Sequence, residues 1–505
     1  MDRATVASGT LSIALLLVSP MPLAGQRPVE RAIVIRGGLM VDGSGGPARR
    51  ADVRVVGDSI AAVAASLTPN PADYVIESAG KVVAPGFIDP YSHADRGIED
   101  WPEAESQVRQ GITLAVVGQD GRSALPIAAF LETVGQVRPA INFATAVGHG
   151  SVRAAVLGAD YRRPATAGEV ATMERLVERG MRDGAVGLSS GLEYDPGFYA
   201  RVEEVASLAA VAARFGGYYA SHVRDEEDGV IGAWQEAIEI GRRAGIHVHI
   251  SHAKLASRAV WGKAAEALAV LDAAAGQGVQ VTADWYPYDF WQSSLYVIVP
   301  DRDWSNPSKW VTGLADIGGP GNVMVTSYPP RPQYVGKTIA QIATDAGTDP
   351  VELILQMLSE YGPNVGIIAT AMDDRDLQRF AVDPRVLVCS DGQLRGRHPR
   401  GYGSFPRVLG RYVRERAMLT LPEAIAKMTI RVATLLGFPD RGTLKVGSKA
   451  DIVVFDPATI QDRGTKATPD QYAVGVEYLI VNGQIVLDAG TMTKARPGRA
   501  LRRRE

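Results

Sequence analysis

Residues 217–254 read GYYASHVRDEEDGVIGAWQEAIEIGRRAGIHVHISHAK, and this stretch decides the fold. It holds two β-rich runs, and each of them ends in Ser-His, at His222 and at His252. Between the runs, Trp234 and Ile238 fall on one face at helical spacing. Strand, helix and strand in this order predict a βαβ unit with parallel strands, so both histidines should lie at the same carboxyl edge. Ligands bind at that edge in parallel α/β proteins, and two imidazoles there could hold a divalent metal or be ordinary polar strand ends.

The same alternation of β and α patterns extends over much of the chain. We expect eight strands separated by helical stretches, which is typical of a (β/α)8 barrel. The expected strands are 86–93, 112–120, 142–148, 185–194, 217–222, 246–252, 279–286 and 385–391.

The segments on either side of the expected barrel, 86–437, have β patterns broken by turns. We expect 26–85 and 438–505 to pair with each other in a small discontinuous β-sandwich domain. Residues 290–362 interrupt the β/α rhythm and are rich in Trp, Pro and Gly. A long excursion of this kind is usually a lid or a binding loop, so this one is predicted to fold over the barrel mouth.

Composition excludes several classes of protein. The net charge is -3 and no basic stripe is present, which argues against a nucleic-acid partner. Cys389 is the only cysteine, so intrachain disulfides and cysteine-rich metal sites are excluded.

The first 25 residues resemble a secretory signal peptide. Arg3 supplies a positive start, residues 11–17 are apolar, and small residues follow at Ala24 and Gly25. A membrane anchor is the alternative, but the apolar run is short for a bilayer and is followed by prolines. We therefore expect a periplasmic or secreted protein without a stable membrane anchor after processing.

Two more strand ends carry residues that bind metals. The first expected strand ends at His93, and the last ends at Asp391. With His222 and His252 they would form a cluster of three imidazoles and a carboxylate at one rim, which is typical of metal-dependent hydrolases. A bound divalent ion lowers the pKa of a coordinated water to about 7. Asp391 could accept that proton and return it to a leaving nitrogen.

A set of motifs then resembles the amidohydrolase superfamily and, within it, the N-acyl-D-amino-acid deacylases (D-aminoacylases). The motifs are APGFIDPYSHAD, GLEYDPGFYA, YYASHVRDE, HISHAK, ADWYPY, CSDG, HPRGYGSFPRVLGRYVRER, GTLKVGSKADIVVFDPATI and VNGQIV. The resemblance implies a distorted (β/α)8 TIM-like barrel beside a small discontinuous β-sandwich, with an insertion over the mouth. It also implies zinc-dependent hydrolysis of N-acylated D-amino acids, which are small-molecule substrates.

The resemblance assigns roles to the metal-binding residues. His222 and His252 look like the ligands of a tightly held zinc. His93 and Asp391 look like ligands of a second, weaker site, and Asp391 also resembles the catalytic base.

Other residues resemble substrate-binding groups of the family. Lys254 and Arg400 look like the groups that hold the substrate carboxylate, with ordinary surface charge as the alternative for both. Tyr194 resembles a tyrosine that assists there, and Tyr288 in ADWYPY is assigned to substrate contact. His149 in GHGSVR could polarise the substrate carbonyl or simply pack.

The chain departs from the family at two positions. Tyr91 stands where the family has the first histidine of His-x-His, and tyrosine, with a pKa of about 10, is a poor zinc ligand. Asp120 stands where the known members have a zinc-binding cysteine. Either Asp120 or Glu193, which we rank slightly higher, could replace the thiolate, so the second metal and the choice of ion are open. A dipeptidase, a cyclic-amide hydrolase and a non-catalytic exported binding protein are alternative functions.

Overall fold

The computed structural model describes residues 1–2, 5 and 31–503. The apolar run on which the predicted signal peptide depends lies outside these residues. Within them, no helix combines the length and the apolarity needed to cross a bilayer.

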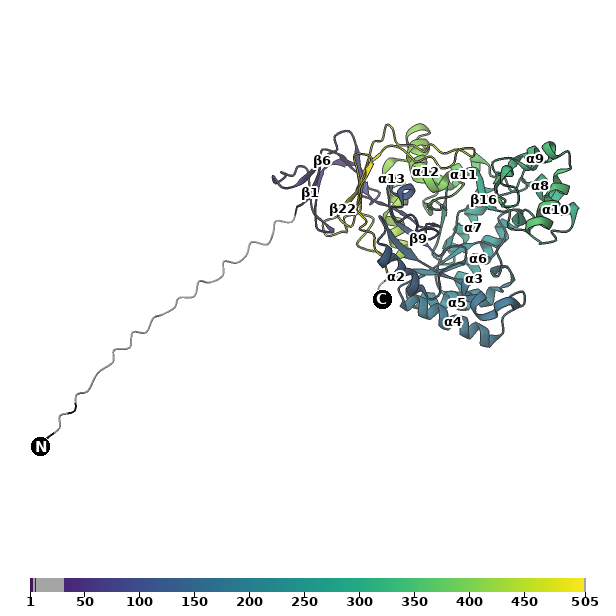
Figure 1. Ribbon diagram of the computed structural model, residues 1–505, viewed down its shortest axis with the longest axis horizontal. Coiled ribbons are helices and arrows are strands. Elements are labelled where there is room, and N and C mark those ends of the chain that lie inside the picture. The colour runs from purple at the N-terminus through teal and green to yellow at the C-terminus, as the bar shows by residue number, and fades with distance from the viewer. Residues whose placement is uncertain (3–4, 6–30, 504–505) are drawn as a thin grey trace.

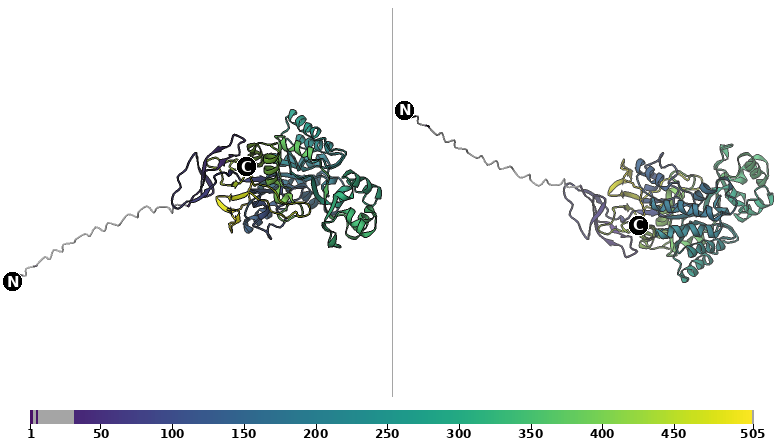
Figure 2. Two further views of the ribbon diagram at one scale, coloured as in Figure 1. Left: turned by 90° about the horizontal axis from the view of Figure 1, so that it is seen from above. Right: turned by 90° about the horizontal axis from the view of Figure 1, so that it is seen from below.

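The barrel contains every strand that the sequence predicts. The barrel has eight strand positions, and the strands at successive positions along the chain run parallel to one another. Helices cover the outer side of the barrel (Figures 1 and 2). The strands are β8 (Phe87–Asp89), β9 (Ile112–Val117), β10 and β11 (Asn142–Thr145 and Val147–Gly148), β12 (Gly187–Gly191), β13 (Tyr218–His222), β14 (His247–Ile250), β15 (Val281–Trp285) and β19 (Val386–Val388). The fold is therefore the predicted distorted (β/α)8 barrel.

The distortion lies in the third barrel strand, which is interrupted at Ala146. Its first half, β10, pairs with β9, and its second half, β11, pairs with β12, so the wall consists of two sheets. The ends of the first and last barrel strands are hydrogen-bonded at the rim, where Asp391 N donates to Tyr91 O at 2.9 Å. His93 N likewise donates to Gly392 O at 2.8 Å, and these bonds bring two strand ends with metal-binding residues together.

The central βαβ unit follows the predicted pattern. Helix α6 (Val230–Ala244) joins β13 to β14, and Trp234 and Ile238 are buried beneath it. Gly241 lets the helix approach the sheet closely, because a Cβ atom there would lie 2.0 Å from Val248 Cγ2. The helix ends at Gly245, whose φ of 63° favours glycine. Close helix packing thus fixes the two strands that carry His222 and His252.

Each of the other helices outside the barrel wall buries one face. In α4, Thr166 and Glu169 form a capping box at the N-terminus. The helices are α1 (Glu105–Val108), α2 (Ile127–Val137), α3 (His149–Leu157), α4 (Ala167–Arg182), α5 (Val202–Arg214), α7 (Ala264–Gly276) and α11 (Asp374–Val382).

The small β domain is assembled from both ends of the chain, as predicted. Strand β7 from the N-terminal part pairs antiparallel with β20 from the C-terminal part, within a seven-stranded sheet. A four-stranded sheet, ordered β5-β4-β1-β6, packs beside it. The strands are β1 (Ile33–Arg36), β2 (Leu39–Met40), β3 (Arg49–Arg50), β4 (Asp52–Val56), β5 (Ser59–Ala64), β6 (Tyr74–Glu77), β7 (Val82–Pro85), β20 (Ile452–Phe455), β21 (Val476–Val481), β22 (Gln484–Asp488) and β23 (Thr491–Met492).

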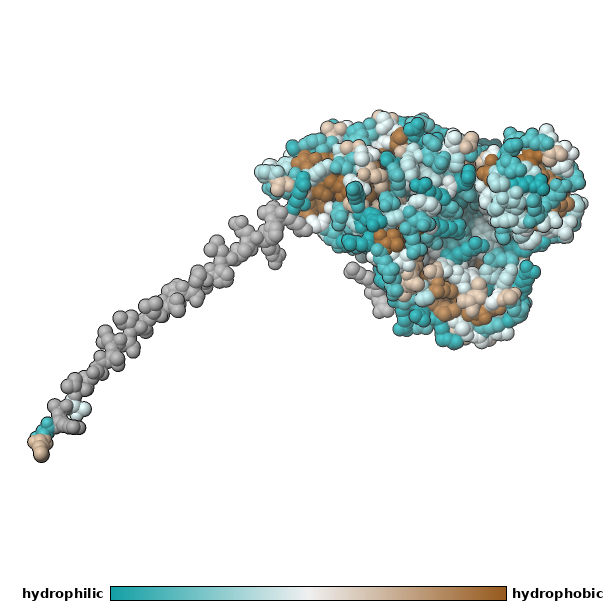
Figure 3. Space-filling view, viewed as in Figure 1, coloured by the Kyte–Doolittle hydropathy of each residue, from teal (hydrophilic) through white to brown (hydrophobic). Residues whose placement is uncertain are grey.

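The segment that interrupts the barrel forms a lobe of its own at one end of the molecule (Figure 1). It contains a three-stranded antiparallel sheet of β16 (Phe290–Ser294), β18 (Gly366–Thr370) and β17 (Val323–Ser327), with helices α8 (Pro307–Asp316), α9 (Ile339–Ala346) and α10 (Pro350–Tyr361). Because β18 pairs with β16, the lobe closes at residue 370, beyond the predicted end at 362. The surface is hollowed between this lobe and the barrel (Figure 3).

The barrel is followed by helical elements that lead back to the β domain. The sequence predicts a helix pair near 420–437, and the structure has α13 (Leu421–Met428) and α14 (Ile430–Leu436). Helix α12 (Arg400–Arg407) and a π-helical turn, Val408–Glu415, precede them.

Candidate metal centre and active site

A cavity of about 230 Å³ opens at the carboxyl edge of the barrel strands. Strand ends and the loops that follow them form its floor, and residues 291–297 of the insertion form one wall. The predicted residues that line it are His93, Asp120, Glu193, Tyr194, His222, His252, Lys254, Asp391 and Arg400. The structure thus brings together nine of the eleven predicted site residues.

Three atoms at the bottom of the cavity converge on one point. His222 Nδ1 lies 2.9 Å from His252 Nε2 and 3.3 Å from Asp120 Oδ1. His252 Nε2 lies 3.9 Å from the same Asp120 oxygen. Ligands about 2.0–2.1 Å from a tetrahedral zinc ion are about 3.3 Å apart, so this triangle fits three of its ligands. Two histidines, one carboxylate and an open fourth position are a donor set for catalytic zinc.

The outward-facing nitrogens of these histidines meet two glutamates. His222 Nε2 lies 2.7 Å from Glu193 Oε2, and His252 Nδ1 lies 3.1 Å from Glu226 Oε1. When the Nε2–H of His222 donates to Glu193, its Nδ1 keeps a lone pair that can bind a metal. The geometry therefore favours Asp120 as the ligand and Glu193 as an orienting group, which reverses the order expected from the sequence.

The charge around this triangle is suited to a cation. Burial by itself lowers the pKa of His222, but Glu226, Asp120 and Glu193 overcome this effect and raise it to about 10. The carboxylates thus favour positive charge at this point of the cavity.

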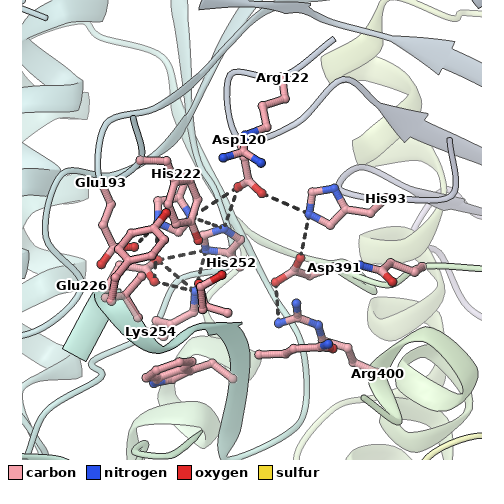
Figure 4. Close-up of a pocket in the computed structure, with 18 of the residues that line it drawn as sticks. His93, Asp120, Arg122, Glu193, His222, Glu226, His252, Lys254, Asp391 and Arg400 are labelled. Carbon is pink, nitrogen blue, oxygen red and sulfur yellow. Dashed lines mark hydrogen bonds and ion pairs between the residues drawn. The ribbon is translucent and has the colours of Figure 1, made fainter. Parts of the chain in front are cut away.

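His93 and Asp391 lie on the other side of Asp120 (Figure 4). His93 Nε2 is 3.2 Å from Asp120 Oδ2 and 3.3 Å from Asp391 Oδ1. Arg400 Nη1 donates to Asp391 Oδ2 at 2.6 Å. Burial alone would raise the pKa of Asp391, but Arg400 and His93 hold it well below its usual range. Asp391 is therefore an ionised carboxylate that can accept a proton.

Tyr91 fills the position of the missing family histidine as a hydrogen-bond donor. Its side chain is buried, its O–H donates to Asp120, and its oxygen lies 3.2 Å from His252 Nε2. Burial and the neighbouring Asp120 raise the pKa of Tyr91 well above its ordinary value. The phenol keeps its proton, so it can orient Asp120 but is unsuited to bind a metal.

The cavity also contains groups that can bind a substrate carboxylate. Arg400 Nε is buried and has no hydrogen-bond partner among the described residues. Lys254 Nζ donates to both carboxylate oxygens of Glu226 at 2.9 and 2.8 Å. The Tyr286 ring lies between these cations, with its centroid 4.8 Å from Arg400 Cζ and 5.9 Å from Lys254 Nζ. Tyr194 packs against His222, with ring centroids 4.3 Å apart.

Two residues predicted for the site lie outside the cavity lining. His149 begins α3, and its Nε2 lies 2.9 Å from Glu204 of α5, on the outer side of the barrel wall. Tyr288 donates its O–H to Asp462 at 3.1 Å. Neither side chain lines the cavity, so the catalytic role expected of His149 and the substrate contact expected of Tyr288 have no support in the geometry.

The structure also shows supporting residues that the sequence did not predict. Glu226 follows His222 by four residues, but it lies inside an acidic run, Asp225 to Asp228, that gives no hint of which carboxylate turns inward. Asp284 lies beneath the site: its Oδ1 accepts from His252 N at 2.5 Å, and its Oδ2 is 2.7 Å from His249 Nε2. These contacts hold His252 in a left-handed backbone conformation with a φ of 35°.

Comparison with known proteins agrees with this architecture. The profile of the amidohydrolase family matches residues 74–381 and 383–487, so the chain belongs to the amidohydrolase family. An N-acyl-D-glutamate deacylase of Alcaligenes xylosoxydans xylosoxydans is 39% identical over 93% of this chain and 96% of its own length. A D-aminoacylase of the same organism is 34% identical over 93% of this chain and 97% of its own.

A solved structure is similarly close. The N-acyl-D-glutamate deacylase of Bordetella bronchiseptica, complexed with zinc and a phosphonate that mimics the tetrahedral intermediate, superposes with a TM-score of 0.85. It is 36% identical, and the match covers 93% of this chain and 99% of that one.

Proposed function

We propose that this protein is a zinc-dependent hydrolase that cleaves the amide bond of N-acyl-D-amino acids. The observation that carries the proposal is the convergence of Asp120, His222 and His252 beside an ionised Asp391. Relatives that are 39%, 34% and 32% identical are named as deacylases of N-acyl-D-glutamate, as a D-aminoacylase and as a deacylase of N-acyl-D-aspartate, which supports the substrate class.

The residues of the cavity have different roles in the proposed hydrolysis. Asp120, His222 and His252 would hold the zinc, which would supply Lewis acidity for the acyl carbonyl and for water. Asp391 takes the proton of the attacking water and returns it to the leaving nitrogen. Arg400, through its free Nε–H, and Lys254 hold the substrate carboxylate and thereby fix the scissile amide at the metal.

We infer that one zinc is held tightly and that a second position is weak. His93 and Asp391 could bind another ion together with Asp120, but Tyr91 keeps its phenol proton where the family has a further imidazole. A site with fewer donors binds more weakly, so a single metal should remain after dialysis.

A stereochemically resolved substrate screen tests the function. Zinc-loaded protein is given matched N-acetyl-D- and N-acetyl-L-amino acids, and the release of free amino acid is measured. We expect turnover of the D-series alone; equal turnover of both series, or turnover of dipeptides or dihydropyrimidines instead, would contradict the proposal.

We also propose that the protein is exported. The support is the sequence alone: Arg3, the apolar run 11–17 and the small residues Ala24 and Gly25. N-terminal sequencing of the protein from cell fractions tests this: a mature start near residue 26 in the periplasm or medium is expected, and an intact N-terminus on cytosolic protein would refute it.

A further inference from the structure

Four basic side chains line the cavity, and only two of them have acidic partners. Lys254 pairs with Glu226, and Arg400 pairs with Asp391. Arg96 and Arg122 also line the cavity and are exposed, yet neither guanidinium makes an ion pair or a hydrogen bond within the part of the chain that the structure describes. The only described contact of the Arg122 guanidinium is with the Tyr194 ring, at 5.9 Å from the centroid. Two cations at a substrate cavity are therefore free to bind an anion.

Arg122 lies on the opposite side of the metal-binding triangle from Lys254 and Arg400 (Figure 4). In Figure 4, Lys254 and Arg400 lie on one side of the cluster, and Arg122 extends beyond Asp120 on the other. Arg96 follows His93 by three residues and faces the same cavity. A substrate has its carbonyl at the triangle and its carboxylate at Lys254 and Arg400. We place its acyl chain on the side of Arg122, with Arg96 lining the same cavity (Figure 4).

The wall formed by the insertion fits the remaining part of the substrate. Trp291 and Val297 line the cavity there and are buried apolar residues. Gln292, Ser293 and Ser294 lie between them, so this wall offers only a small apolar surface to the amino-acid side chain, whereas the two arginines offer charge to the acyl chain.

We propose that the acyl group removed by this enzyme ends in a second carboxylate, as succinyl does, and that Arg96 and Arg122 bind it. This inference rests on the proposed deacylase function. Water adds to the amide carbonyl, the C–N bond breaks, the nitrogen takes up a proton, and a dicarboxylate leaves with the free D-amino acid. Both arginines are exposed, so the contribution of each should lie at the low end of the range for hydrogen bonds to charged groups. We therefore expect each arginine to raise kcat/KM for the carboxylate substrate about tenfold.

The experiment compares isosteric substrates on the zinc-loaded protein. N-succinyl-D-leucine and its terminal amide, N-succinamoyl-D-leucine, differ only in one charge. We expect kcat/KM to favour the carboxylate by about a hundredfold, and the ratio to fall about tenfold in Arg96→Gln or Arg122→Gln. The ratio should also fall with rising salt. Arg175→Gln, which removes an exposed arginine from helix α4, is the matched control and should keep the ratio.

Two further measurements distinguish a failure of the proposed anion site from a failure of the proposed deacylase function. N-acetyl-D-glutamate and N-acetyl-D-glutamine are compared in the same variants; if the arginines govern this pair and leave the succinyl pair alone, the second carboxylate belongs to the amino acid and the inference is wrong. Calorimetric binding of the succinyl and succinamoyl compounds gives the ratio without turnover. Absence of turnover with preferential succinyl binding would refute the deacylase function alone, whereas equal binding would refute the anion site.

Discussion

Replacing Asp120 by asparagine should release the zinc, and replacing Glu193 by glutamine should only weaken its binding. Both substitutions keep the shape of the side chain and remove one charge. An oxygen of Asp120 lies 3.3 Å from His222 Nδ1, which is the nitrogen that faces His252 Nε2. Glu193 lies 2.7 Å from the other ring nitrogen of His222, Nε2. The contrast therefore tests which carboxylate touches the ion.

The expected magnitudes fall in adjacent ranges, with the larger loss expected for Asp120→Asn. Loss of an outer carboxylate that orients a ligand histidine weakens metal binding about 10–100-fold. Removing one partner from a buried charge pair costs about 3–5 kcal/mol, which corresponds to about 10²–10⁴ in Kd. Asp120→Asn should fall in the second range, and Glu193→Gln in the first.

The assay is zinc content by mass spectrometry after equilibration in chelator buffers of stepped free zinc. Glu227→Gln is the matched control, because Glu227 lines the same cavity but makes no described contact with either histidine. Burial raises the pKa of Glu227 well above its ordinary value, and glutamine keeps the shape of that side chain. Circular dichroism checks that each variant is folded. Zinc lost from Glu193→Gln but retained by Asp120→Asn would refute the assignment.

Three other outcomes follow from the geometry. Asp391→Asn should lower kcat by about 10²–10⁴ with the zinc content kept, because a proton acceptor is lost; unchanged kcat in steady-state assays would contradict its role as a base. Tyr91→His should raise bound zinc above one equivalent in the same metal analysis, since it supplies an imidazole beside His93, and a value that stays at one would show that something else limits the second site. Gly241→Ala should destabilise the fold by about 1–3 kcal/mol, because the methyl group meets Val248, and a thermal unfolding midpoint equal to that of the parent protein would show that α6 shifts freely.

Much of the framework could be predicted because parallel strands impose one direction on their ends. The Ser-His endings at His222 and His252, together with His93 and Asp391, were expected at one rim from strand order alone, and the cavity contains all four. The eight strands could also be predicted from the sequence, because each is a short β-rich run between helical patterns.

The roles of the carboxylates could not be predicted in the same way. Sequence spacing places Asp120 and Glu193 near the rim but does not say which nitrogen of His222 each one faces. Glu226 lies in a loop after β13, where no periodicity indicates direction. For His149 the two sequence-based alternatives could not be separated, because it follows a strand end but already belongs to helix α3, which turns its side chain toward Glu204.

The pairing of β7 with β20 has a consequence during synthesis on the ribosome. One edge of β7 has no partner until β20 is made, about 370 residues later in the chain. At the usual elongation rate of about 5–20 residues per second, this wait lasts about 20–70 s. The nascent chain thus carries an open strand edge through most of translation, and a product truncated before residue 452 would keep that edge and be prone to aggregate.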